Sequence, residues 1–228
     1  MTTTAPTSLA DETYHAIRKR VAAGDWPAGM RLVNRKLGAE LGVSMVPVRE
    51  ALNRLASEGL VEHVPGAGAF VRRLDRKQIV QLYELREQLE CFAAREAAAR
   101  IRPDQLEQLE RLCADWRTLL GRIRQSKGRT ATAAVLRKWL DNDLNFHRVL
   151  IEAADNPWLA KTVMDLRLLS VVVRNKPGTL PLSSAERTHR DHEKLVTVLG
   201  KGNAEESERV MRRHVTDGRE FILRHLEE

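Results

Sequence analysis

The sequence predicts a mainly α-helical protein in two parts, a small N-terminal unit of three helices with a hairpin and a C-terminal all-α bundle of six longer helices. Glycine and proline are closely spaced as far as residue 68 and sparse afterwards, so short elements precede long ones. Apolar residues recur at helical spacing in both parts. We place the boundary between residues 8–75 and 76–228, because Asp75 can cap a new helix.

Composition restricts the class of protein. The 228 residues are 43% hydrophobic, and 38 Lys and Arg against 31 Asp and Glu give a net charge of +7. This charge is compatible with nucleic-acid binding without proving it. No apolar run approaches the roughly 20 residues of a membrane span, and the first dozen residues do not have the pattern of a secretory signal. The two cysteines, Cys91 and Cys113, form no framework, so we expect inert core thiols and a cytoplasmic protein.

The N-terminal elements follow one another in a recognisable order. Apolar spacing predicts a helix over 8–23, a short helix from Asn34 that ends at Gly42, and a third helix that Ser44 caps and that runs to Glu58. Two short apolar runs, 60–64 and 69–71, flank a glycine-rich turn and predict a hairpin. Helix, turn, helix and hairpin together predict a winged helix-turn-helix, whose second motif helix enters the DNA major groove.

The expected DNA contacts lie at the start of that helix, on the helix before it and at the hairpin tip. A hydroxyl and free N–H groups at a helix start suit a phosphate, and an arginine one turn on can reach a phosphate or a guanine edge. The predicted contact residues are Arg35, Ser44, Met45, Val46, Arg49, His63 and Gly66.

Residues 37–71, LGAELGVSMVPVREALNRLASEGLVEHVPGAGAFV, resemble the DNA-binding domain of the GntR family of bacterial transcription regulators. The family pattern has arginine directly after the capping serine and often threonine next, where this chain has Met45 and Val46. Apolar side chains cannot donate hydrogen bonds to guanine, but they can pack on a thymine methyl group.

The C-terminal part carries the start signals of long helices. Pro103 and Pro157 suit first helical positions, Asn156 suits a cap, and Ser183 and Asn203 each precede a glutamate at capping-box spacing. Apolar stripes support a packed bundle, among them Ile79, Leu82, Leu89 and Phe92 in the first helix and Leu109, Leu112, Trp116, Leu119 and Ile123 in the second. The predicted helices span 76–100, 103–126, 131–154, 157–174, 184–200 and 203–226.

Three histidines and one aspartate in these helices form a candidate metal site. Asp143 and His147 are one turn apart on the same helix face, and His192 and His214 lie beside apolar residues of the last two helices. Three imidazoles and a carboxylate suit Zn²⁺, Ni²⁺ or Mn²⁺. By spacing alone, histidines at the surface or hydrogen-bonded in the core remain the more common interpretation.

Two stretches, DNDLNFHRVLIEAADNPWL and DHEKLVTVLGKGNAEESERVMRRHV, resemble the signature segments of the FCD effector domain in the FadR-like branch of the same family. The resemblance implies that Asp143, His147, His192 and His214 bind a divalent metal, with zinc favoured over nickel or manganese. Six helices in place of seven are similar to the VanR-type subgroup. His189, one turn before His192, is a substitute ligand or a supporting partner.

The segment Glu84-Leu-Arg86-Glu87 is similar to the family's E-L-R-x-x-L-E stretch, whose arginine often faces the effector pocket. There Arg86 can hold a carboxylate in bidentate fashion, while a surface salt bridge remains the alternative. Arg174, at the end of the fourth bundle helix, is a weaker candidate of the same kind.

We therefore predict a metal-containing transcription repressor, not an enzyme, that binds double-stranded operator DNA as a homodimer and responds to a small organic acid. The helical domain is expected to supply the effector pocket and the dimer contacts. Two alternatives remain open: a sensor for which the metal is itself the effector, and a metal-dependent helical hydrolase. Against the hydrolase, the sequence has no adjacent His-Asp pair and no evident general base beyond the ligands.

Overall fold

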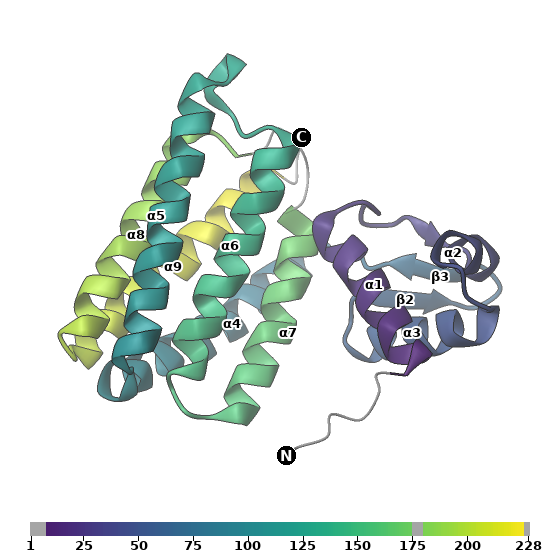
Figure 1. Cartoon of the computed structure of the whole chain (residues 1–228), viewed down its shortest axis with the longest axis horizontal. Helices are drawn as coiled ribbons and strands as arrows, with labels where there is room; N and C mark the ends of the chain where they lie inside the picture. The colour runs from purple at the N-terminus through teal and green to yellow at the C-terminus, as the bar shows by residue number, and fades with distance from the viewer. Residues whose placement is uncertain (1–7, 175–179, 226–228) are drawn as a thin grey trace. The chain divides into compact units, whose positions relative to one another are not determined.

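The structure is a computed structural model that describes residues 8–174 and 180–225, without the side chains of Val173 and Arg174. The described residues form two compact units (Figure 1). Residues up to Arg73, together with the described residues 171–174, belong to the first unit, and residues Leu74–Ser170 belong with the C-terminal helices to the second. The predicted fold class, a winged helix-turn-helix followed by a helical bundle, is confirmed.

The first unit contains every predicted N-terminal element. Its helices are α1 (Leu9–Ala23), α2 (Asn34–Leu41) and α3 (Met45–Ser57), and its hairpin strands are β2 (Val61–Val64) and β3 (Gly68–Val71). Gly42, with φ of 69°, ends α2 in the left-handed conformation that glycine tolerates best. The apolar stripes of α1 and α3 meet in a core of fully buried side chains that includes Ile17, Val48, Leu52 and Leu55.

A third strand in this unit, β1 (Arg31–Leu32), is absent from the sequence-based prediction. It pairs antiparallel with β3, Arg31 opposite Phe70, in a sheet of order β1-β3-β2. Two residues are too few to show an alternating pattern, so only the pairing with β3 defines this strand.

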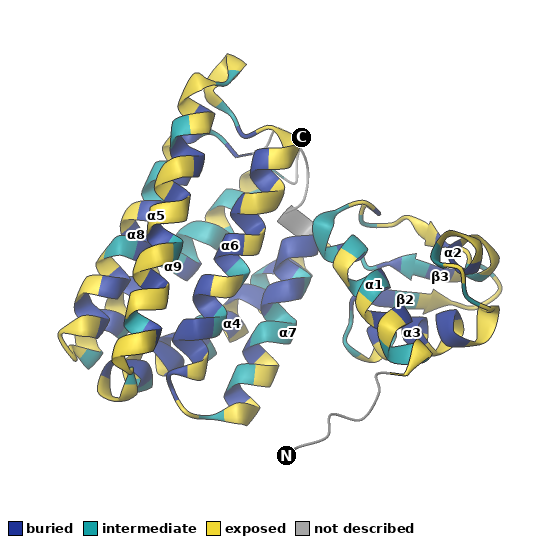
Figure 2. Ribbon diagram, in the orientation of Figure 1, coloured by how far each residue is buried: buried dark blue, intermediate teal, exposed yellow. Residues whose placement is uncertain are grey.

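The second unit contains six α-helices among its described residues, and their bounds agree with the predicted ranges to within two residues. Packing joins α4 to α9, α5 to both α6 and α8, and α8 to α9. Buried residues lie mainly on the sides of the helices that face the inside of the bundle (Figure 2). The large side chains of Trp116, Trp139 and Phe146 are fully buried. The helices are α4 (Arg76–Arg100), α5 (Pro103–Gln125), α6 (Ala133–Glu152), α7 (Pro157–Arg174), α8 (Leu182–Gly200) and α9 (Ala204–His225), with a short 3₁₀ turn at Lys127–Arg129.

Side-chain caps define several of these helix starts as predicted. The Asp75 carboxylate accepts from the backbone N–H of Gln78 at 2.7 Å, and the Gln78 side chain completes a capping box. Asn156 and Asn203 accept in the same way from the N–H groups three residues on, each at 3.0 Å.

The capping box expected at Ser183 is wrong. Helix α8 begins two residues earlier than predicted, at Leu182, and its cap position is Pro181. The reason is tertiary: the Leu180 carbonyl accepts from the N–H of Ala131 at 2.9 Å, which holds the approach to the helix against another part of the bundle.

Helix α4 also departs from the sequence-based expectation. Phe92, expected in the core, is 48% exposed. The buried side of α4 runs instead from Ile79 through Arg86 and Glu90 to Ala97, so two charged residues occupy positions that an apolar stripe would fill.

Both cysteines are buried and unbridged, as expected, and burial raises the pKa of each thiol to about 12. Within the described ranges, no helix combines the length and the apolar character needed to cross a membrane.

Candidate metal centre and DNA-binding surface

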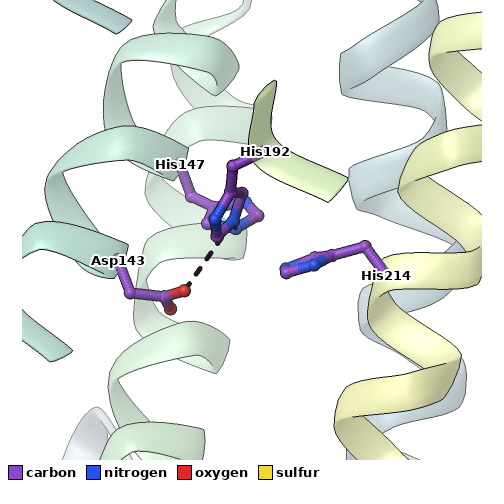
Figure 3. Close-up of side chains that lie close together, drawn as sticks. All are labelled: Asp143, His147, His192 and His214. Carbon is purple, nitrogen blue, oxygen red and sulfur yellow. Dashed lines mark hydrogen bonds and ion pairs between the residues drawn. The ribbon is translucent and has the colours of Figure 1, made fainter. Parts of the chain in front are cut away.

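Four predicted ligands converge inside the bundle. Asp143 and His147 extend from α6, His192 from α8 and His214 from α9, and each offers one ligand atom within 4.8 Å of the others. Figure 3 shows the four side chains pointing toward one another from these separate helices. All but His214, which is slightly exposed, are buried.

The spacing of these atoms suits a divalent ion. Two ligands of one Zn²⁺, each about 2.0–2.2 Å from the metal, lie about 3–3.5 Å apart. Nε2 of His147 and Nε2 of His192 are 3.2 Å apart, and Nε2 of His192 lies 3.9 Å from Oδ1 of Asp143. The donor set and its geometry therefore fit the metal that the family resemblance implies.

The electrostatic environment keeps the imidazoles neutral, as ligation requires. Burial lowers the pKa of His192 and of His214 well below the ordinary value, and the neighbouring imidazoles add to this effect. Burial also lowers the pKa of His147, with a further contribution from the positive charge of Arg167. Each ring can thus present a lone pair to a cation.

The surroundings of the three rings differ. Nδ1 of His147 lies 3.2 Å from Oε2 of Glu90, whereas Nδ1 of His214 lies 4.0 Å from Oδ2 of Asp191. His192 stacks on Trp116 with ring centroids 4.1 Å apart and an interplanar angle of 3°. Its Nδ1 is buried and has no hydrogen-bond partner among the described residues, and the 3.2 Å approach of Glu90 to Nδ1 of His147 is likewise a close contact without the geometry of a hydrogen bond.

Metal binding at His192 should change the fluorescence of Trp116, because the two rings are stacked in direct contact. Titration with Co²⁺ or Ni²⁺, whose open d shells quench nearby fluorophores, should lower the emission until one ion is bound per chain. Trp116→Phe should remove most of this response and leave emission from the other three tryptophans, Trp26, Trp139 and Trp158. An undiminished response in that variant would contradict the stacking geometry as its source.

A buried network of charges surrounds the candidate metal centre. Arg86 Nε donates to Glu90 Oε1 at 2.7 Å, and Arg86 Nη1 donates to the Ser170 hydroxyl at 3.0 Å. Arg167 donates to both Glu90 and Asp143, the latter at 2.7 Å. Burial alone would raise the pKa of Glu90, but Arg167 and Arg86 outweigh it and hold that pKa well below the ordinary value.

Sequence reasoning did not identify Glu90 and Arg167. Glu90 is the last residue of the E-L-R-x-x-L-E segment, and Arg167 interrupts the apolar end of α7. A charged residue inside an apolar run was therefore the signal that could have identified Arg167.

Of the predicted effector residues, Arg86 is 3% exposed and adjoins the centre through Glu90. Its ion pair with Glu90 is therefore buried, and the alternative of a surface salt bridge is excluded. The side chain of Arg174 lies outside the described residues. His189 contacts Glu193 at 3.3 Å and does not belong to the cluster.

In the first unit, the predicted DNA contacts are all on the surface. Ser44 occupies the cap position of α3, and its hydroxyl makes no capping hydrogen bond. Met45 and Val46 are 58% and 52% exposed, although apolar side chains of this size are usually buried. Their exposure is consistent with contact to another molecule. The remaining exposed residues of the set are Arg35, Arg49, His63 and Gly66.

A surface hollow of about 400 Å³ brings two of these residues together. Arg49 of α3 and His63 of β2 line it with Arg31, Asn34 and Asn53, which the sequence did not single out. Strand β1, which placed Arg31 beside the hairpin, was too short to predict. Cationic and amide side chains of this kind are suited to phosphate and base edges.

An exposed recognition helix with a wing defines a DNA-binding regulator, and comparison with known proteins gives the family. Residues 9–71 match the bacterial regulatory proteins of the gntR family, and residues 81–217 match the FCD domain. The chain belongs to the GntR family of bacterial transcription regulators, in the group that carries an FCD domain.

Relatives with nearly full-length similarity have the same class of function. The HTH-type transcriptional repressor RspR of Escherichia coli is 27% identical over 215 residues, 92% of this chain and 87% of that protein. A probable D-xylose utilization operon repressor of Paenarthrobacter nicotinovorans is 28% identical over 92% of this chain and 86% of its own length. These relatives are transcription regulators and not enzymes, so the hydrolase alternative is set aside.

Solved structures show the same fold. The E. coli protein McbR/YncC superposes with a TM-score of 0.78 at 18% identity, covering 97% of this chain and 99% of its own. A putative GntR regulator from Rhodococcus sp. RHA1 gives a TM-score of 0.72 at 20% identity, covering 94% and 97% of the two chains.

Proposed function

We propose that this protein is a transcription repressor whose binding to operator DNA, as a homodimer in the cytoplasm, is controlled by a small organic acid bound at a divalent metal ion. In this proposal residues 8–75 bind DNA, and residues 76–228 bind the effector and form the dimer. Asp143, His147, His192 and His214 hold the metal, with zinc favoured. The observation that carries the proposal is the convergence of these four side chains inside the bundle.

Charge balance supports an anionic effector. The buried carboxylates of Glu90 and Asp143 are matched by the buried guanidinium groups of Arg86 and Arg167, and the three imidazoles are neutral. A dication therefore brings two uncompensated positive charges into a site that excludes water, which is unfavourable. A carboxylate in the remaining metal positions would reduce that charge, and Arg86, which adjoins the centre through Glu90, would hold another part of the acid.

Two exposed apolar residues on α4 support a homodimer. Leu85 and Phe92 are 47% and 48% exposed and lie seven residues apart, on one side of the helix. Trp158, at the start of α7, is 83% exposed. Large exposed apolar side chains mark surfaces that other proteins cover, and a second copy would provide the second α3 helix that a two-fold-symmetric operator requires.

Metal removal should uncouple the effector from DNA. We expect the zinc-loaded protein to release its operator when the correct organic acid is added, and the chelated protein to retain the operator whether or not that acid is present. The measurement is operator affinity across a panel of small mono- and dicarboxylic acids. It compares zinc-loaded protein with protein whose metal has been extracted by a chelator, and the chelator is removed before the acids are added.

The remaining alternative, a sensor of the metal itself, predicts a different pattern: chelation alone would change operator affinity, with no acid present. Full response to an acid in protein shown to be free of metal would contradict the proposed function.

A further inference from the structure

The carboxylate of Glu90 is the point where the candidate metal centre meets the buried arginines. It is completely buried, and its two oxygens contact three partners from three helices. Oε1 accepts from Arg86 on its own helix, and Oε2 contacts both Arg167 on α7 and Nδ1 of His147 on α6. A buried carboxylate is costly unless each oxygen is compensated, and here both are.

Of the three clustered imidazoles, His147 has the closest carboxylate. Its Nδ1 lies 3.2 Å from Glu90, while His214 is 4.0 Å from Asp191 and His192 is supported by stacking. A neutral imidazole carries its proton on one nitrogen only, and an acceptor beside Nδ1 favours the proton there. Nε2 of His147, which faces His192, is then left with its lone pair.

We propose that Glu90 is a positioning residue for the metal centre: it fixes the ring orientation and tautomer of His147 so that Nε2 is the ligand atom. Arg86 and Arg167 hold the carboxylate in place for this role. The inference rests on the proposed function in one respect, that His147 is a metal ligand. The tautomer of His147 does not depend on that function, because it exists before any metal is bound. No role for Glu90 follows from the family resemblance.

The first test uses the unmodified protein. Nitrogen-15 NMR of the imidazole side chains, assigned by comparison with His147→Gln, should show His147 protonated at Nδ1 in the metal-free protein. Addition of Zn²⁺ should then shift the Nε2 resonance and leave the Nδ1 proton in place. A metal-free His147 protonated at Nε2, or zinc ligation through Nδ1, would overturn the proposal.

Variants provide the second test. Glu90→Ala should weaken zinc binding about 10–100-fold, the usual effect of removing such a partner, in competition with a chromophoric chelator. Glu90→Gln should recover part of the affinity, because its amide oxygen can take the place of the carboxylate oxygen beside Nδ1 as an acceptor. The matched control is Glu87→Ala, on the same helix, whose carboxylate accepts from Arg212 at 2.7 Å at the edge of the bundle. This control should bind zinc normally.

The outcomes separate this inference from the proposed function. If zinc does not bind but His147 carries its proton on Nδ1, the metal-dependent function fails, and of the inference only the effect of Glu90 on the tautomer of His147 stands. If zinc binds equally well to the parent, Glu90→Ala and Glu87→Ala, the metal site stands and the role of Glu90 is refuted. Glu90→Ala can fail to fold, because Arg86 and Arg167 both lose a buried carboxylate partner. In that case the NMR measurement on the unmodified protein tests the role of Glu90.

Discussion

His214→Ala will lose stoichiometric metal and, with it, the stabilisation that metal provides. His214 is the only clustered ligand on α9, so its loss detaches one of three helices from the ion. At a zinc concentration 100 times its Kd, the parent should gain about 2.7 kcal/mol of stability over the metal-free state, and the variant should gain much less. Metal content per chain and melting temperature, each with and without zinc, are the measurements.

This position is a better test than the other ligands for a structural reason. Removing Asp143 would deprive Arg167 of a buried partner, and removing His147 would alter the contact to Glu90, so either change perturbs the fold directly. His189→Ala is the control, since His189 is also a helix histidine in this region but contacts Glu193 instead of the cluster. Normal metal content in His214→Ala, or its loss in His189→Ala, would contradict the assigned ligand set.

Arg49→Ala is expected to abolish specific operator binding while leaving the helical content unchanged. Arg49 is exposed on the first turns of α3 and lines the hollow beside the wing. A bidentate arginine–guanine contact is worth about 1–3 kcal/mol, so its loss from both half-sites of a dimer costs about 2–6 kcal/mol, or at least about a thirtyfold loss of affinity. Gel retardation and far-ultraviolet circular dichroism measure the two parts of this prediction.

The control for Arg49 removes the same charge from elsewhere in the domain. Lys19 is exposed on α1, outside the surface formed by α3 and the wing, and Lys19→Ala changes the net charge equally. It should shift affinity only slightly, through the general electrostatic attraction of DNA. Equal losses in the two variants would show that Arg49 acts through its charge alone, without a specific contact.

Local patterns were sufficient for most of the fold. Capping signals at Asp75, Asn156 and Asn203 place helix starts correctly because a cap involves residues only three positions apart. The metal cluster was also predictable, because Asp143 and His147 share a helix face and the family resemblance linked them to two distant histidines.

The remaining features depend on contacts between distant segments. Strand β1 exists through its pairing with β3, and the start of α8 depends on the hydrogen bond from Ala131 to Leu180. The inward position of Glu90 depends in part on Arg167, 77 residues away, which compensates its charge together with Arg86 of the same helix. Hydrophobic periodicity treats a charged residue as exposed, so it assigned Phe92 to the inside of α4.

The ion pairs among Arg86, Glu90, Arg167 and Asp143 have a consequence for the relation between folding and metal binding. These pairs connect α4, α6 and α7 without any help from a metal. Zinc fingers follow the opposite order, since they remain unfolded until the ion arrives. If the proposed function is correct, we expect newly synthesised chains of this protein to complete the bundle first and to bind a metal ion afterwards. Under the proposed function, the folded cluster would then select among the available divalent ions, and chains without metal would be folded but unloaded.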